Sequence, residues 1–146
     1  MGALTHELRE FLDSNPVGML ATLAPDGKAR QRLVYYSREG DRLLISTLDD
    51  RFKARDTRRT RQASVCVMGH QPPYPSATFS GPAVILTENI GPPTAAIAQR
   101  ITRASEPPDP GSDRALAEAG RVILAIDIDR LTAANYIPEA TRQAQS

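Results

Sequence analysis

The sequence contains few of the residues from which catalytic and metal sites are usually built. Its 146 residues include two histidines, one cysteine and no tryptophan. Neither His6 nor His70 has a second histidine or cysteine at metal-ligand spacing, so no metal site is expected. The lone Cys66 lacks a partner for an internal disulfide, and its apolar surroundings at 65–68 predict a reduced, buried side chain. No catalytic side chain is predicted.

The chain also lacks a strong net charge and a long apolar segment. Its formal net charge is +1, which is too small for the positive field of a protein that neutralises many nucleic-acid phosphates. No stretch approaches the roughly 20 apolar residues that cross a bilayer. Residues 1–15 carry scattered charges and no apolar centre, unlike a secretory signal. We expect a cytoplasmic protein that binds neither membranes nor nucleic acid.

The residues that are abundant favour a globular chain made of short elements. Hydrophobic residues make up 40% and charged residues 24%, while twelve prolines and nine glycines imply many turns. The length suits one compact domain, which we expect to span residues 1–146.

Six segments have the β-prone composition of strands and are bounded by turn-forming residues. Pro25-Asp26-Gly27 predicts a hairpin between the first two, and residues 37–41 turn the chain into the third, giving a meander. Gly81-Pro82 predicts a bend within the fifth strand. The expected strands cover residues 17–23, 30–36, 43–47, 63–68, 76–86 and 121–128.

Apolar residues at helical spacing predict short helices between these strands. The first follows the candidate cap Thr5 and ends before Pro16, and Asp49 or Asp50 is expected to cap a second over residues 51–59. Two more are expected at 94–103 and 114–119. The predicted fold is mainly β with short helices (α+β), a six-stranded antiparallel barrel whose closure removes exposed strand edges.

The most informative segment for function runs from Ser46 to Arg61. Lys53 lies in the first turn of the expected helix, where free N–H groups and the helix dipole favour an anion. Ser46 and Thr47 end the preceding strand, so hydroxyl, amide and ammonium groups are expected to converge on an anion. The remaining cations Arg58, Arg59 and Arg61 are interpreted as a solvated face.

The order of features from residue 17 to residue 67 carries a family resemblance. It comprises the strand GMLATL, the Asp26-Gly27 turn, the strand RLVYY, the strand LLIST, the helix start FKAR and the strand ASVCV. This order resembles the pyridoxamine-phosphate-oxidase-like split-barrel family, whose members use FMN or the deazaflavin F420. The resemblance implies a split β-barrel, a symmetric homodimer and cofactor sites at the subunit interface.

The resemblance also implies roles for individual residues. Ser46 and Thr47 would hydrogen-bond the cofactor phosphate, Lys53 would pair with it and Arg51 would assist. Ser76 would approach the cofactor from the partner subunit. The strand residues at 32–34 would line the ring, mostly through backbone groups. The implied cofactor-binding set is Arg32, Leu33, Val34, Ser46, Thr47, Arg51, Lys53, Ala54 and Ser76.

The chain departs from the family pattern at the helix start. Many members have arginine directly before the lysine, where this chain has Phe52, and an Asn-Leu pair after it, where this chain has Asp56-Thr57. The segment Ile137-Pro138-Glu139 contrasts with the basic end of the true pyridoxamine-phosphate oxidases. Vitamin B6 synthesis is therefore not expected.

The expected function is a flavin- or deazaflavin-dependent oxidoreductase, with F420 favoured over FMN, that transfers a hydride to or from a small organic substrate. Such an enzyme needs no side-chain acid, base or nucleophile, which suits this composition. Two alternatives remain open. One is a non-catalytic FMN- or haem-type binding protein on the same fold. The other, less favoured, is a nucleic-acid-binding barrel that uses the basic segment and nearby tyrosines.

Overall fold

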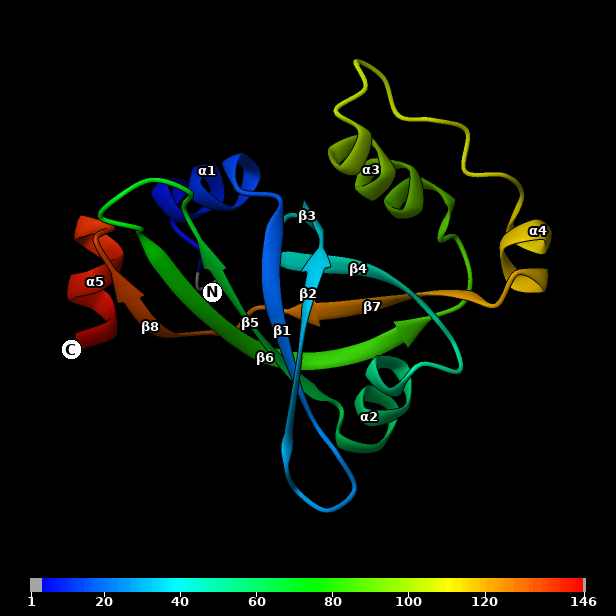
Figure 1. The fold of residues 1–146 in the computed structure, drawn as a ribbon, viewed down its shortest axis with the longest axis horizontal. Helices are drawn as coiled ribbons and strands as arrows, with labels where there is room; N and C mark the ends of the chain where they lie inside the picture. The colour runs from blue at the N-terminus through cyan, green and yellow to red at the C-terminus, as the bar shows by residue number, and fades with distance from the viewer. Residues whose placement is uncertain (1–3, 146) are drawn as a thin grey trace.

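The computed structural model describes residues 4–145, which form a curved antiparallel sheet with short helices around it (Figure 1). This is the predicted class and agrees with a split barrel, although eight strands are present in this part of the chain rather than six. In chain order the elements are α1 His6–Ser14, β1 Val17–Leu23, β2 Ala29–Tyr35, β3 Ser37–Glu39, β4 Arg42–Leu48, α2 Phe52–Thr60, β5 Gln62–Met68, β6 Ser76–Leu86, α3 Gly91–Thr102, α4 Asp113–Glu118, β7 Arg121–Asp127, β8 Arg130–Asn135 and α5 Pro138–Gln145.

The strands do not follow the order in which they occur in the chain. The sheet runs β2-β1-β5-β6-β7-β4-β3, and β8 pairs with β6. The predicted meander is therefore wrong, because β4 does not pair with β2 but lies between β3 and β7. Both β4 and β7 are apolar on both faces, and each needs a covered, central position. Pairing them with each other satisfies this need.

Strand β6 bends at Gly81 and thereby joins the two halves of the sheet (Figure 1). Its first part, from Ser76 to Pro82, pairs with β5, and its second part, from Ala83, pairs with β7. A Cβ atom at residue 81 would lie 1.8 Å from the carbonyl oxygen of Asp127. Glycine is required here because a neighbouring backbone occupies the space of a side chain, and the predicted bend is confirmed.

Two layers of apolar side chains hold the elements together. The first fills the barrel interior and includes the fully buried Leu20, Val65 and Phe79. The second lies on the opposite face of the β4–β7 pair, where Leu44 and Ile123 pack with residues of α3 and α4. This second layer fixes α3 beside the end of β4, where the anion site was predicted.

Helix α1 begins as predicted, because the Thr5 hydroxyl accepts a hydrogen bond from the Leu8 amide at 3.2 Å. At its other end the Leu12 carbonyl accepts hydrogen bonds from the Tyr36 hydroxyl at 2.7 Å and the Arg100 guanidinium at 3.1 Å. Burial raises the pKa of Tyr36 well above its ordinary value. These contacts fasten α1 to the chain after β2 and to α3.

Three elements and two local details differ from the sequence expectations. Strands β3 and β8 and helix α5 were not predicted, and residues 37–41, expected as a turn, include β3. Neither Asp49 nor Asp50 caps α2, because its N-cap is Arg51, which makes no side-chain cap hydrogen bond. Cys66 is half-buried rather than buried, since strand alternation points its neighbours Val65 and Val67 into the barrel instead.

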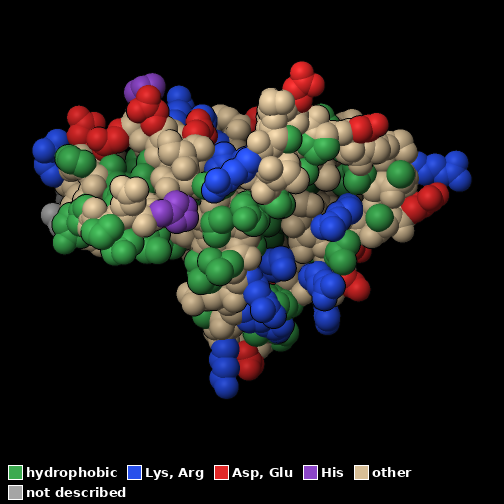
Figure 2. Space-filling model, turned by 45° about the horizontal axis from the view of Figure 1, so that its top comes forward, with side chains coloured by type: hydrophobic (Ala, Val, Ile, Leu, Met, Phe, Trp, Pro, Cys, Tyr) green, Lys and Arg blue, Asp and Glu red, His purple; other side chains and the backbone are tan. Residues whose placement is uncertain are grey.

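The sides of β1, β2, β5 and β6 that point away from the barrel form what we call the outer face. Cross-strand register places Met19 beside Leu33 and Cys66, and Met68 beside Ser76. Leu33 is 71% exposed and Met68 is 52% exposed. Hydrophobic side chains gather around the middle of the molecule in Figure 2, above a group of Lys and Arg. The outer face is thus an uncovered apolar surface.

Among the helices of residues 4–145, none has both the length and the apolarity required to span a membrane. In the same residues, no three His, Cys, Asp or Glu side chains are grouped so that they could hold a metal ion.

Candidate functional site

A pocket of about 360 Å³ lies where four separate parts of the chain meet. These parts are the end of β2, the β4–α2 junction, helix α3 and the start of β7. Its volume falls within the range of small-molecule sites. The lining residues are Leu33, Val34, Tyr35, Ser46, Lys53, Thr94, Ile97, Ala98, Ile101 and Arg121.

Lys53 is the half-buried cation of this pocket. Its pKa lies below the ordinary value, first because burial removes water from the ammonium group and then because Arg32 and Arg51 repel its charge. Among residues 4–145, no carboxylate forms a salt bridge with it. A bound anion would offset both the lost hydration of the ammonium group and its repulsion by the two arginines.

The start of α2 adds uncharged donors beside Lys53. The first N–H groups of any helix lack partners within the helix, and the side chain of the N-cap Arg51 supplies no substitute for one. Ser46 lies on the same pocket wall, half-buried near the end of β4. This combination of hydroxyl, amide and ammonium groups is the chemistry that binds a phosphate.

The other walls offer backbone polar groups and an apolar surface. Strand β2 is an edge strand with β1 on one side, and within the described residues no strand pairs with its opposite edge, which borders the pocket. Its unpaired backbone groups are available to a ligand. Helix α3 contributes Ile97, Ala98 and Ile101. A planar heterocycle with polar edges fits a site with these two walls.

The structure brings four of the nine predicted cofactor-binding residues together in the pocket: Leu33, Val34, Ser46 and Lys53. The other five do not line it. Thr47 is buried on the barrel side of β4. Ala54 is on the buried side of α2, and Arg51 is exposed at the helix start. Ser76 lies on the outer face at the start of β6. Arg32 lies beside Phe52, with its guanidinium carbon over the ring.

Phe52 has three cations around its ring. The guanidinium carbons of Arg30 and Arg32 lie 5.1 Å and 5.2 Å from the ring centroid, and the Lys53 ammonium lies 5.5 Å from it. Such contacts stabilise a cation over an aromatic face. The residue that replaces the family's usual arginine therefore collects basic side chains near the pocket, although it carries no charge itself.

Asp56 fastens α2 to the barrel behind this cluster. Its carboxylate is buried, accepts a hydrogen bond from the Thr22 hydroxyl at 3.0 Å, and lies 3.1 Å from the Arg59 guanidinium and 3.5 Å from that of Arg30. Arg58 pairs in turn with Asp49. Arg58, Arg59 and Arg61 are exposed, as expected for a solvated face, and Arg58 and Arg59 form ion pairs there.

Six of the ten lining residues were not in the predicted cofactor-binding set: Tyr35, Arg121 and the four α3 residues Thr94, Ile97, Ala98 and Ile101. The available signal was slight: Arg121 follows Gly120 and opens a strongly apolar strand. Only the pairing of β7 with β4 brings it to the site.

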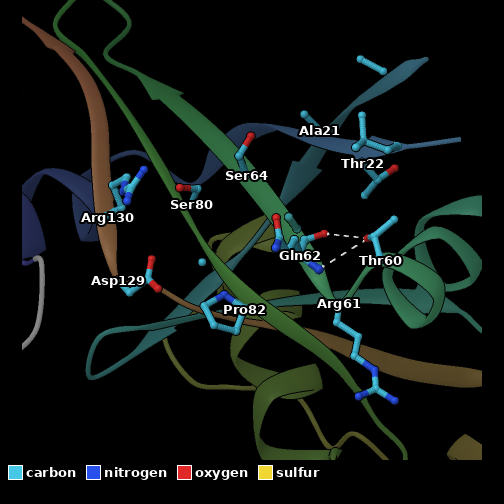
Figure 3. Close-up of a pocket in the computed structure, with 14 residues that line it drawn as sticks. Ala21, Thr22, Thr60, Arg61, Gln62, Ser64, Ser80, Pro82, Asp129 and Arg130 are labelled. Atoms are coloured by element: carbon cyan, nitrogen blue, oxygen red, sulfur yellow. Dashed lines mark hydrogen bonds between the residues drawn. The ribbon is translucent and has the colours of Figure 1, made fainter. Parts of the chain in front are cut away.

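A larger hollow of about 600 Å³ lies elsewhere, along β1, β5 and β6 (Figure 3). It contains the hydroxyls of Ser64 and Ser80, but the Arg61 side chain points away from them (Figure 3). Thr60 is engaged with the backbone of Gln62, donating to its carbonyl at 3.2 Å. Lacking a desolvated, unpaired cation, this hollow is a weaker candidate for an anionic cofactor than the pocket at Lys53.

Comparisons with known proteins agree with the fold. The family model for pyridoxamine 5'-phosphate oxidase matches residues 4–133. No curated protein matches the chain. Among solved structures, a conserved hypothetical protein from Mycobacterium tuberculosis has a TM-score of 0.72 at 20% identity, covering 88% of this chain and 83% of that one.

Two further solved structures are similar over most of their length. An F420 reductase has a TM-score of 0.63 at 22% identity, covering 84% of this chain and 94% of its own. An FAD-binding protein from Mesorhizobium loti has a TM-score of 0.65 at 23% identity, covering 88% and 92%. At these identities the likeness establishes a shared fold.

Proposed function

Because the chain belongs to the pyridoxamine 5'-phosphate oxidase family, we propose that it is an oxidoreductase that holds a flavin or deazaflavin in the pocket between β2, α2 and α3. When bound, the ring of such a cofactor accepts or donates the hydride. The protein's own residues bind the phosphate, orient the ring and exclude water from it.

The observation that carries this proposal is the half-buried, unpaired Lys53 at the start of α2. Paired with a phosphate, its ammonium recovers the solvation that burial removes. Ser46 and the first N–H groups of α2 donate to the remaining phosphate oxygens. The predicted contacts of Thr47, Arg51 and Ala54 with the cofactor remain part of the proposal, although the amides of Arg51 and Ala54 already donate to the carbonyls of Leu48 and Arg51.

The ring end of the site rests on β2 and α3. The free edge of β2 at Leu33 and Val34 offers hydrogen bonds in the plane of a ring, and Ile97 and Ile101 offer an apolar face. No aspartate, glutamate or histidine lines the pocket within the described residues. In this proposal the reaction therefore depends on the cofactor rather than on a side-chain acid or base of the lining, and the substrate is a small organic molecule. F420 is favoured over FMN because the LATL and KAR segments resemble the deazaflavin-using branch of the family.

The active form in this proposal is a homodimer joined through the outer face. A second copy on this face would remove the exposed leucine, methionine and tyrosine side chains from water, which is favourable. Ser76 and the larger hollow lie on the same side, so a second copy seated on the outer face meets both. This geometry supports the expected approach of Ser76 to the cofactor of the partner subunit.

The experiment that tests the proposal is a titration of the purified protein with FMN and with F420, followed by absorbance and fluorescence. We expect binding of one cofactor in the micromolar range or tighter. Lys53→Met should weaken that binding at least about tenfold, since a charge-assisted contact is lost. Arg55→Met, a change at an exposed cation of the same helix, is the matched control and should leave binding unchanged. No spectral response to either cofactor rejects the proposal.

A binding protein without turnover is the second candidate. The absence of acidic and histidine side chains from the pocket lining also suits a carrier, and one similar structure is named only as FAD-binding. Oxidation of the reduced cofactor by a panel of small electron acceptors separates the two candidates. Tight binding with no oxidation above the rate of free cofactor favours the carrier.

A further inference from the structure

A second cation of the pocket, Arg121, has no role in the proposal above. It is the first residue of β7 and stands opposite Leu48 in the ladder with β4. Two residues further along, Ile123 stands opposite Ser46. Because side chains alternate along a strand, Arg121 and Ser46 share the face of this strand pair that α3 covers. Both line the pocket.

The arginines at the two ends of the β4–β7 ladder have different partners. At the far end Arg42 stands opposite Asp127 and pairs with it at 2.9 Å. At the pocket end Arg121 stands opposite the apolar Leu48, and no carboxylate of residues 4–145 forms a salt bridge with it. The cation at the pocket end thus has its charge available for a ligand.

The backbone before Arg121 is held in place. The Gly120 carbonyl accepts a hydrogen bond from the Asp49 amide at 2.8 Å, which links the start of β7 to the chain just after β4. Gly120 has a φ of +74°, and its own amide donates to Ala117 at the end of α4. Arg121 therefore starts from a fixed position beside the junction that leads into α2.

We infer that Arg121 is a second anion-binding residue of this pocket, and that the site selects ligands carrying a phosphate group over the corresponding alcohols. The inference rests on the proposed function and names the residue that determines its phosphate selectivity. Lysine acts as a point charge, whereas the planar arginine fork directs several N–H groups at phosphate oxygens. Arg121 supplies this fork in a chain that has Phe52 directly before its lysine.

The test compares FMN with riboflavin, which has the same ring but lacks the phosphate. If the protein binds F420 and not FMN, F420 and the corresponding deazaflavin alcohol take their places in the same comparison. Affinities are measured by flavin fluorescence for the wild type, Arg121→Gln, Arg121→Lys and Arg114→Gln. Arg114 is an exposed arginine of α4, paired only with Glu118 within the described residues, and serves as the matched control. Thermal unfolding verifies that every variant is folded.

We expect Arg121→Gln to weaken FMN binding about tenfold, the size of one charge-assisted contact, and to leave riboflavin binding within about twofold. Arg121→Lys should recover part of the loss, and Arg114→Gln should resemble the wild type. Unchanged FMN affinity in Arg121→Gln overturns the inference. So does an equal loss for FMN and riboflavin, because Arg121 would then only support the pocket wall.

The failure of this inference is distinguishable from that of the proposed function. If the wild type binds neither FMN nor F420, the proposed function is wrong, and Arg121 is then tested with inorganic phosphate in thermal-shift measurements. Phosphate that raises the unfolding temperature of the wild type but not of Arg121→Gln supports an anion site at Arg121. No difference between the two proteins overturns it.

Discussion

At the scale of single residues, Lys53 reduces the stability of the ligand-free protein. The folded chain holds its proton less tightly than the unfolded chain does, because burial and two neighbouring cations lower its pKa. At neutral pH the residue is charged in both states, and the full penalty applies. The penalty fades as pH rises through the lowered pKa towards the ordinary value of 10.5.

Lys53→Met is therefore expected to raise the unfolding temperature of the ligand-free protein at pH 7, even though it removes a proposed cofactor contact. The gain should shrink as pH rises above the lowered pKa of Lys53, because the wild-type lysine is then neutral in the folded state. Thermal unfolding at pH values from 7 to about 10.5 measures both effects. Arg55→Met is again the control, and a loss of stability in Lys53→Met at pH 7 contradicts the argument.

At the scale of elements, Gly81 is the position on which the joining of the two sheet halves depends. Gly81→Ala places a Cβ atom 1.8 Å from the Asp127 carbonyl oxygen, a contact that only a backbone shift can relieve. We expect a loss of more than about 3 kcal/mol in the free energy of unfolding, in the range of severe backbone clashes. Urea unfolding followed by circular dichroism measures the loss.

Gly18→Ala is the comparison for this prediction. A Cβ atom at residue 18 would lie 2.9 Å from a methyl group of Val65, a side chain that can move. This variant should lose clearly less stability than Gly81→Ala. Equal losses in stability would mean that the close approach of β6 and β7 is not the reason for glycine at residue 81.

Sequence patterns located those elements whose local signals and burial agree. Strands β1 and β6 have the predicted bounds, and α1 has its predicted cap. The missed β3 has only three residues, and β8 has a single fully buried side chain, Ala134, so neither carries the periodicity of a strand. Strand order depends on which apolar faces meet in space, and local pattern does not encode that choice.

The same distinction applies to the pocket. Ser46 and Lys53 are close in the sequence and belong to one strand-to-helix step, so helix-terminus chemistry and family resemblance could both identify them. Arg121 and the α3 wall enter through the β4–β7 pairing and the second apolar layer. Their contribution could be recognised only once those long-range contacts were known.

At the scale of the whole molecule, the outer face predicts self-association. Light scattering should report a dimer, and Met68→Glu should shift the protein towards the monomer, because a buried unpaired carboxylate is costly at an interface. Ala117→Glu is the control, because Ala117 is an exposed residue of α4 and lies outside the strands of the outer face. A monomeric wild type, or dissociation by both variants alike, contradicts this assignment.

The pocket is assembled from β2, the β4–α2 junction, α3 and Arg121, which are spread over most of the chain. During synthesis the ribosome adds about 5–20 residues per second from the N-terminus, so the β7 wall emerges long after Lys53. In the proposed function, a nascent chain therefore cannot bind a cofactor until nearly the whole protein has left the ribosome. Ligand binding would then require a nearly complete chain. A truncated chain would lack the added stability that a bound ligand gives.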